Sequence, residues 1–200
     1  MLLLRVLPVL FRPRSGWASI KDRNYSVANA FFGHTVLFAL IPPVCGYLGT
    51  TRTGWSFGLE RSVRITAESA LPISIVYYLA LLMATASVAW AAHWMSRTYG
   101  AKASFSAALV LASVTATPLF LVGFAQLLPE LWLNLLLGLP ALAWTIMLFY
   151  SGVPIMLEVS AERGFLLACA VMAFGLVALV AMLVLFVLLW SYGFAPTFTS

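Results

Sequence analysis

Two histidines are the side chains in this sequence best suited to hold a metal ion or a haem. His34 and His93 each lie in an apolar run, and the imidazole ring is a common ligand for both kinds of cofactor. A metal site needs further ligands at the same level, and no such set stands beside either histidine. A metal shared by the pair is therefore the less favoured alternative. The sequence predicts local hydrogen bonds for both rings, with no cofactor and no metal.

The acidic and nucleophilic residues form no catalytic pattern. The sequence has no Gly-rich phosphate loop, no His-Glu-x-x-His pair and no nucleophile elbow. Glu158, Glu162 and Arg163 are expected in a solvated turn. Cys45 and Cys169 lie in apolar runs, and a helical rise of about 1.5 Å per residue would place them in opposite leaflets, beyond disulfide reach. The expectation is a protein that is not an enzyme.

These residues belong to a chain that is too apolar for a soluble fold. Its 200 residues are 63% hydrophobic and only 8% charged, with a mean hydropathy of +1.02. Soluble domains carry roughly 25% charged and 45–50% apolar residues. A soluble fold cannot bury this much apolar surface, so the remainder must face lipid. The predicted fold class is therefore an all-α membrane protein.

Five windows of the sequence are long enough to span a membrane as helices, which takes about 20 mostly apolar residues. They cover residues 28–49, 70–95, 105–127, 131–150 and 165–191. Helices are expected because each span must satisfy its own backbone hydrogen bonds within the lipid. Residues 28–191 would form the membrane domain, and residues 192–200 a short tail on the outer side.

Residues 1–27 form a basic segment that precedes the first span. Arg5 and Pro8 interrupt its apolar residues and no small-residue cleavage site follows, so an amphipathic segment on the membrane surface is expected rather than a signal peptide. The apolar side chains expected to enter the interface are Leu2, Leu3, Leu7, Leu10 and Phe11, and the basic ones expected at phosphate level are Arg5, Arg12 and Arg14. Anionic lipid headgroups are the predicted partner of this segment.

The distribution of lysine and arginine predicts the orientation of the chain. Eight of the eleven basic side chains fall on one side, in residues 1–27 and in the second and fourth connections. The other three, Arg52, Arg61 and Arg64, fall in the first connection. Cytoplasmic segments of membrane proteins are enriched in basic residues. The N-terminus is therefore predicted in the cytoplasm and the C-terminus outside.

Prolines interrupt three of the expected helices. Pro42 and Pro43 lie in the outer half of the first span, Pro118 follows Thr117 in the third, and Pro140 lies near the middle of the fourth. Each removes a backbone donor and clashes with the preceding turn. The resulting kinks either splay the bundle towards the outside or are simply the prolines common in membrane helices.

The stretch after the first prolines, IPPVCGYLGTTRTGWSFG at residues 41–58, predicts an irregular exit from the membrane. Turns are expected at Gly46, Gly49 and Gly54, because glycine adopts conformations that other residues resist. Trp55 is expected to return the chain to the membrane interface.

Small residues recur at the spacing of helix contacts. The stripes are Ala80, Ala84, Ser87 and Ala91 on the second span, and Ala108, Ala112 and Ala116 on the third. Such stripes let helices approach closely. The fifth span is almost uniformly apolar, with Gly175 as its one obvious contact point, and is the span expected to face lipid.

Four stretches of the chain together resemble the Yip-domain family, in its bacterial inner-membrane branch. They are LFRPRSGW before the first span, the 41–58 stretch, TATPLFL in the third span and FYSGVP after the fourth. The residues that carry this resemblance are Pro42, Pro43, Gly46, Gly49, Gly54, Trp55, Thr117, Pro118, Tyr150, Gly152 and Pro154. The resemblance implies a five-helix domain in a bacterial inner membrane. The GTPase-linked role of eukaryotic members is not carried over, because this chain lacks their long acidic N-terminal region.

The function expected from these observations is membrane organisation or interaction, without catalysis. Partners would be lipid and a membrane protein, or a second copy of the chain, and nothing points to nucleic acid. The alternative is a small transporter or channel whose outer kinks form a vestibule. Coupled transporters usually hold an ionisable group deep in the membrane, and no Asp, Glu, Lys or Arg lies in the middle of any expected span.

Overall fold

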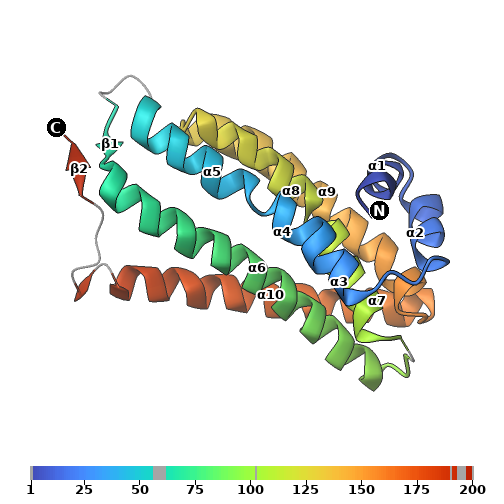
Figure 1. The fold of residues 1–200 in the computed structure, drawn as a ribbon. Coiled ribbons are helices and arrows are strands. Elements are labelled where there is room, and N and C mark those ends of the chain that lie inside the picture. Colours follow the sequence, from blue (N-terminus) through green and yellow to red (C-terminus); the bar gives the residue numbers. More distant parts are fainter. Residues whose placement is uncertain (1, 56–61, 102, 190, 193–196, 200) are drawn as a thin grey trace.

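The computed structural model of the chain is built from long helical rods that lie side by side (Figure 1). It describes residues 2–55, 62–101, 103–189, 191–192 and 197–199, so Arg61 and Lys102, two of the basic residues used to predict orientation, lie outside the described residues. The elements are α1 (Leu3–Phe11), α2 (Pro13–Lys21), α3 (Val27–Ala30), η1 (Phe31–Thr35), α4 (Val36–Phe38), α5 (Ile41–Leu48), η2 (Gly49–Thr53), β1 (Arg64–Ile65), α6 (Ala67–Thr98), α7 (Phe105–Thr115), α8 (Thr117–Val122), η3 (Gly123–Leu127), α9 (Leu131–Met156), α10 (Ala161–Leu189) and β2 (Phe198–Thr199).

Five helical segments are long and apolar enough to cross a membrane, which confirms the predicted all-α fold. They are Val27–Thr53, Ala67–Thr98, Phe105–Leu127, Leu131–Met156 and Ala161–Leu185, called spans one to five below. Span two is longer than predicted because its helix continues past the apolar window at both ends. Thr66 caps its first turn by accepting a hydrogen bond from the Ser69 amide at 3.3 Å.

The two ends of the bundle carry different structures (Figure 1). The hairpin end holds α1, α2 and the connections after spans two and four. The tail end holds β1 and β2, which pair antiparallel with Arg64 opposite Thr199. Thr197 reinforces this pairing, since its hydroxyl lies 2.9 Å from that of Thr66 and 2.6 Å from that of Ser69. The C-terminal residues are thus held against the start of α6.

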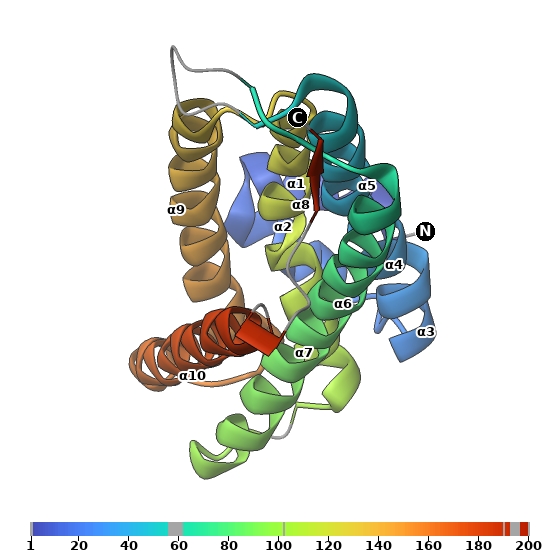
Figure 2. The same cartoon turned by 90° about the vertical axis from the view of Figure 1, so that its left-hand side faces the viewer.

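Span three is the centre of the bundle. Every residue from Ala108 to Thr115 in α7 is buried, and α7 and α8 lie between α6, α9 and the first span (Figure 2). The predicted contact residues Ala108 and Ala112 are among the buried ones, whereas Ala116 is half-buried. Small side chains here allow the other helices to approach from several sides.

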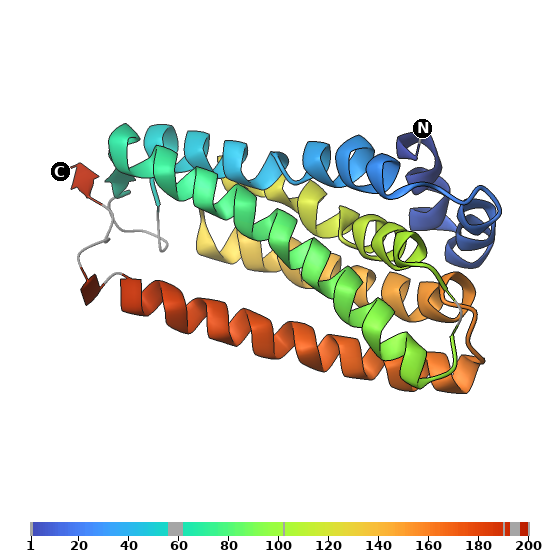
Figure 3. The same ribbon diagram turned by 60° about the horizontal axis from the view of Figure 1, so that its bottom comes forward.

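Only part of the stripe predicted on span two is buried, since Ala91 is buried whereas Ala80 and Ser87 are half-buried. Ala84 is exposed, while the buried residues in that part of α6 are Thr85, Ala89, Ala91, Ala92 and Ser96. They concentrate in the half of α6 nearer the hairpin end, because α6 crosses the bundle obliquely and meets α7 only there (Figure 3). A run of small residues predicts that a contact can form, but the crossing angle decides which of them form it.

Span five faces lipid as expected, but it shares this role with two other spans. Residues 176–181 of α10 are exposed without interruption, so every side of the helix is open there. Only 6% of the most apolar window is buried in each of spans two and four, compared with 17% in span five and 61% in span three. Gly175 is not a contact point, because an added Cβ atom would meet nothing within 4 Å.

The N-terminal segment is a helical hairpin that packs into the bundle rather than lying wholly on the membrane surface. Leu2, Val6 and Val9 of α1 and Trp17 and Ile20 of α2 are buried in the common core. The expectation for Leu2 was therefore wrong, and Leu10 also packs against that core. Two other predicted interface residues remain open, with Leu7 58% and Phe11 80% exposed. The hairpin thus buries one face in the bundle and leaves Leu7 and Phe11 exposed on another.

Candidate functional site

The irregular exit of span one is shorter than the sequence predicted, because helical structure continues past the prolines to Thr53. The α-helix is interrupted at Ala39 and Leu40, and Pro42 and Pro43 lie at the start of α5. Proline is tolerated in a first helical turn, where its missing N–H has no partner to lose. Helical structure then continues through Gly46 to Leu48, and η2 extends it to Thr53 with π-type turns.

The glycines of this stretch allow span one to touch span three. A Cβ atom on Gly46 would lie 2.7 Å from Oε1 of Gln126, and one on Gly49 would overlap the Gln126 carbonyl oxygen. Gly123 of η3 in turn lies against Pro42, with its added Cβ atom 2.6 Å from Pro42 Cγ. The kinks of these two spans therefore pack together and do not splay apart.

Gly54 ends span one with the turn that the sequence predicted. Gly54 has a φ of 86°, a conformation that favours glycine. Trp55 then pairs with Val63, its amide donating to the Val63 carbonyl at 2.7 Å. The Trp55 ring is partly exposed at the tail end, where a membrane interface is expected.

A buried polar cluster joins spans one and three where both helices are irregular. Thr117 Oγ1 lies 3.2 Å from His34 Nε2, and Thr35 Oγ1 donates to Ser113 Oγ at 2.7 Å. His34 and Thr35 belong to the π-helical η1, and Thr117 opens α8 just before Pro118. His34 Nδ1 has no partner among the described residues. The predicted local hydrogen bonding of His34 is thus extended to a contact between two spans.

The two histidines occupy separate environments. His93 Nε2 lies 3.1 Å from a guanidinium nitrogen of Arg97 on its own helix. His34 instead contacts Thr117 of span three. Among the described residues, no group of three or more His, Cys, Asp or Glu side chains could hold a metal ion. Both cysteines are free thiols, and Cys169 Sγ lies 3.1 Å from the hydroxyl of Tyr150.

The FYSGVP motif of span four is where the N-terminal hairpin is attached. Trp17 is fully buried against Gly152, whose added Cβ atom would lie 2.7 Å from Trp17 Cε2 and 2.6 Å from Leu111 Cδ1. The Trp17 indole N–H donates to Ser151 Oγ at 3.3 Å. Pro154, two residues on, packs against Gly164 at the start of α10. One short motif thus contacts α2, α7 and α10.

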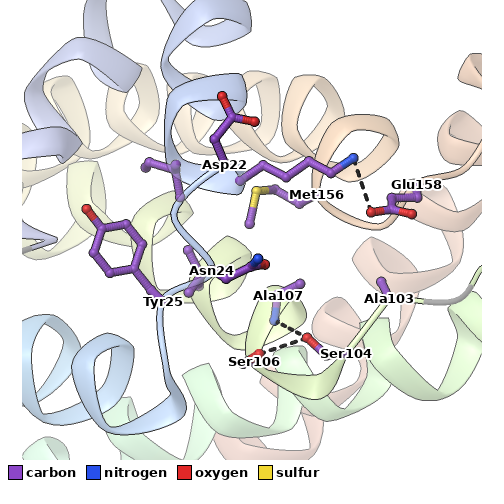
Figure 4. A pocket seen from close by; sticks show the side chains of 12 residues that line it. Asp22, Asn24, Tyr25, Ala103, Ser104, Ser106, Ala107, Met156 and Glu158 are labelled. Atoms are coloured by element: carbon purple, nitrogen blue, oxygen red, sulfur yellow. Dashed lines mark hydrogen bonds and ion pairs between the residues drawn. The ribbon is translucent and has the colours of Figure 1, made fainter.

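A cavity of about 430 Å³ opens at the hairpin end, beside this attachment (Figure 4). Ile20, Val110 and Met156 supply apolar lining, and all three are buried. The polar lining residues are Lys21, Asp22, Asn24, Tyr25, Ser104, Ser106 and Glu158. Lys21 Nζ and Glu158 Oε1 form an ion pair of 3.2 Å that joins α2 to the turn after α9. The cavity therefore combines an apolar lining with charges of both signs.

Sequence reasoning missed this cavity and the residue that anchors its wall. Trp17 was read only as part of a surface segment. The spacing of Leu2, Val6 and Val9 is that of one helical face, and this signal could have predicted a packed hairpin. The meeting of Lys21 with Glu158 depends on how two distant segments fold together, and the sequence carries no signal for it.

Comparison with known proteins confirms the family that the sequence resembles. A model of the Yip1 domain matches residues 7–182. Inner membrane protein YohC of Escherichia coli strain K12, and that of E. coli O6:H1 strain CFT073, are each 34% identical to the chain over 175 residues, which cover 88% of this chain and 90% of the relative. No solved structure matches the chain. The matched region extends from the N-terminal hairpin well into span five, so the chain belongs to the Yip1 domain family.

Proposed function

We propose that this chain is a non-enzymatic protein of a bacterial inner membrane that acts through contacts of its helices with lipid, and with a membrane protein or a second copy of itself. The observation that carries the proposal is the open apolar surface of spans two, four and five around a closed interior. The exposed face of α10 at residues 176–181 has no small or polar side chain except Ala178 and Ala181. Such a surface is suited to lipid, its two alanines leave room for a packed helix, and it supplies no catalytic group.

The interior polar groups support contact rather than transport. His34, Thr35, Ser113 and Thr117 bond mainly to one another, and so tie two spans together in place of lining a path. The outer vestibule expected of a transporter would lie at Pro42, where Gly123 instead packs closely. The transporter reading thus has no observation of its own, and interhelical hydrogen bonds of this kind commonly hold membrane helices together.

The placement in the membrane is part of the proposal. The relatives are named inner membrane proteins, and a bacterial inner membrane is proposed for this chain. The hairpin end would face the cytoplasm. Arg12, Arg14 and Arg23 are exposed there, beside the exposed Leu7 and Phe11, an arrangement suited to anionic headgroups.

Cysteine labelling in intact cells tests the closed interior. In a background with Cys45→Ser and Cys169→Ala, Ser113→Cys should resist a charged, membrane-impermeant thiol reagent, both in intact cells and in inverted membrane vesicles, which expose the opposite face. Ser113 is fully buried and bonded to Thr35. Ser191→Cys is the matched control, because Ser191 is exposed at the tail end and should label from outside. Labelling of Ser113→Cys would reveal a water-filled path through the bundle. That result would contradict the proposed function and favour the transporter.

A further inference from the structure

The cavity at the hairpin end lies at the depth of lipid headgroups. It opens among the connections that leave the bundle after α2, before α7 and after α9. Trp90 and Trp94 of α6 are exposed towards the same end and stack in parallel with ring centroids 5.8 Å apart. Tryptophan concentrates at membrane interfaces, where its ring is partly apolar and its N–H is wet. The cavity therefore opens where phosphates and polar headgroups are found.

The lining of the cavity changes from apolar to charged. Ile20, Val110 and Met156 offer an apolar surface, whereas Lys21, Asn24 and Ser104 offer donors. In Figure 4 Asn24, Ser104 and Glu158 surround one space, while the Asp22 carboxylate points away from Ser104 and Glu158. The lining therefore holds one cation, neutral donors and two carboxylates, of which the Glu158 carboxylate is the one beside Lys21.

This set of charges suits a ligand that carries both signs. A phosphate can accept hydrogen bonds from the Lys21 ammonium and from the Asn24 and serine side chains, and a primary ammonium can donate to the Glu158 carboxylate. A quaternary ammonium has no N–H to donate. A headgroup with only a negative charge would leave Glu158 beside it without a cation, since Lys21 is the cation among the lining residues.

The existing ion pair does not block such a ligand. The Lys21 and Glu158 side chains are 38% and 55% exposed, and pairs this open to water are weak. Replacing their mutual contact with bonds to a phosphate and an ammonium keeps both charges neutralised.

The backbone takes a left-handed turn on both sides of the same cavity. Asn24 and Glu158, with φ of 43° and 57°, are the non-glycine residues with positive φ in the described part of the chain, and both line this cavity. Each of the two follows the end of a helix, where a residue in the left-handed region commonly closes the last turn, and both are brought to the same cavity.

We propose that this cavity binds the headgroup of an aminophospholipid, with its phosphate at Lys21, Asn24 and Ser104 and its primary ammonium at Glu158. The apolar lining residues contact the glycerol and the first methylenes. The inference needs only that the bundle spans a membrane. It goes beyond the proposed function and is independent of the chain's orientation and of whether the chain catalyses a reaction.

Lipid binding to the purified full-length protein tests the assignment. The delipidated protein in mild detergent is titrated with phosphatidylethanolamine, phosphatidylcholine or phosphatidylglycerol of identical acyl chains, and the bound lipid is counted by native mass spectrometry. We expect phosphatidylethanolamine to bind roughly tenfold more tightly than the others, the effect of one charge-assisted hydrogen bond. Equal binding of all three lipids would overturn the proposal.

Variants connect the preference to the cavity. Glu158→Gln should make phosphatidylethanolamine and phosphatidylcholine bind alike, and Lys21→Gln should weaken both. Glu162→Gln is the matched control, because Glu162 is exposed on the first turn of α10 outside the lining, and it should keep the preference. A preference that survives Glu158→Gln in folded protein would assign the lipid to another site. If Glu158→Gln does not fold, Lys21→Gln and Asn24→Gly decide, since unchanged binding in both would overturn the proposal.

Soluble phosphoethanolamine distinguishes a lipid from a free headgroup. We expect it not to displace the lipid at equal concentration, because it lacks the apolar part that meets Ile20, Val110 and Met156. Displacement under these conditions would assign the cavity to a soluble phosphoamine and overturn the lipid assignment.

Discussion

At the scale of single residues, glycine and threonine control how the helices meet. Gly152 gives Trp17 its place on span four, and Thr117 gives His34 a partner in the membrane interior. In both cases the small or polar side chain acts through what it touches on another segment. The effect of each contact on stability can be separated from that of helix propensity. The chain offers a second glycine, Gly138, and a second threonine, Thr115, that lack the contact.

Gly152→Ala should destabilise the fold. Its new methyl group would lie under 3 Å from atoms of Trp17 and Leu111, and overpacking of a buried site costs about 1–3 kcal/mol. Gly138→Ala is the control on the same helix, since nothing lies within 4 Å of its added Cβ atom. It should be neutral or stabilising by up to about 1 kcal/mol. Unfolding in a denaturing detergent gives both values. Equal stability of the two variants would show that Trp17 does not pack against Gly152.

Thr117→Val should destabilise the fold by about 1–3 kcal/mol, because it leaves a buried ring nitrogen of His34 without its partner. Thr115→Val, two residues away, should be neutral or stabilising. The Thr115 hydroxyl is buried and has no partner among the described residues, so its removal leaves nothing unpaired. The same unfolding measurement compares the two. The reverse order of stabilities would refute the His34–Thr117 contact.

At the scale of elements, hydrophobicity predicted the spans but not their contacts. The five apolar windows were correct because lipid demands about 20 apolar residues whatever the packing. Gly46 and Gly49 were expected to form turns, yet both are helical, because a glycine also serves where another backbone approaches. The sequence alone does not distinguish a glycine that forms a turn from one that allows close approach. The distinction depends on the position of Gln126 opposite Gly46 and Gly49. The hairpin cavity was missed for the same reason, since Lys21 and Glu158 are far apart in the chain.

Two glycines on span one should respond differently to the same substitution. Gly49→Ala places a methyl group on the backbone carbonyl of Gln126, which cannot rotate away, so a loss of roughly 3 kcal/mol or more is expected. Gly46→Ala meets only the end of the Gln126 side chain, and that amide can turn aside from the contact. Its cost should be about 1 kcal/mol or less. Folded yield in membranes and unfolding in detergent provide the comparison. Equal effects would place η3 away from span one.

At the scale of the whole molecule, an odd number of spans separates the two ends of the chain. The N-terminal hairpin and the C-terminal strand β2 lie at opposite ends of the bundle in Figure 1. Because α1 and α2 pack into the hairpin end through Trp17, the N-terminal segment follows that end to whichever side it faces. Exposed Arg12, Arg14 and Arg23 lie at this end, and basic residues are retained on the cytoplasmic side.

Reporter fusions should therefore give opposite results at the two ends. Alkaline phosphatase joined after Ser200 should be active and green fluorescent protein joined there dark, because the first folds only outside the cytoplasm in this assay and the second only inside. Fusions after Gly100, in the connection between spans two and three at the hairpin end, should show the reverse pattern. The two sites control for each other, since expression or stability defects would lower both reporters at one site. Fluorescence after Ser200 with phosphatase activity after Gly100 would invert the proposed orientation while leaving the five-span fold intact. The same active reporter at both sites would contradict the fold itself, because an odd number of helices separates each of these points from the other.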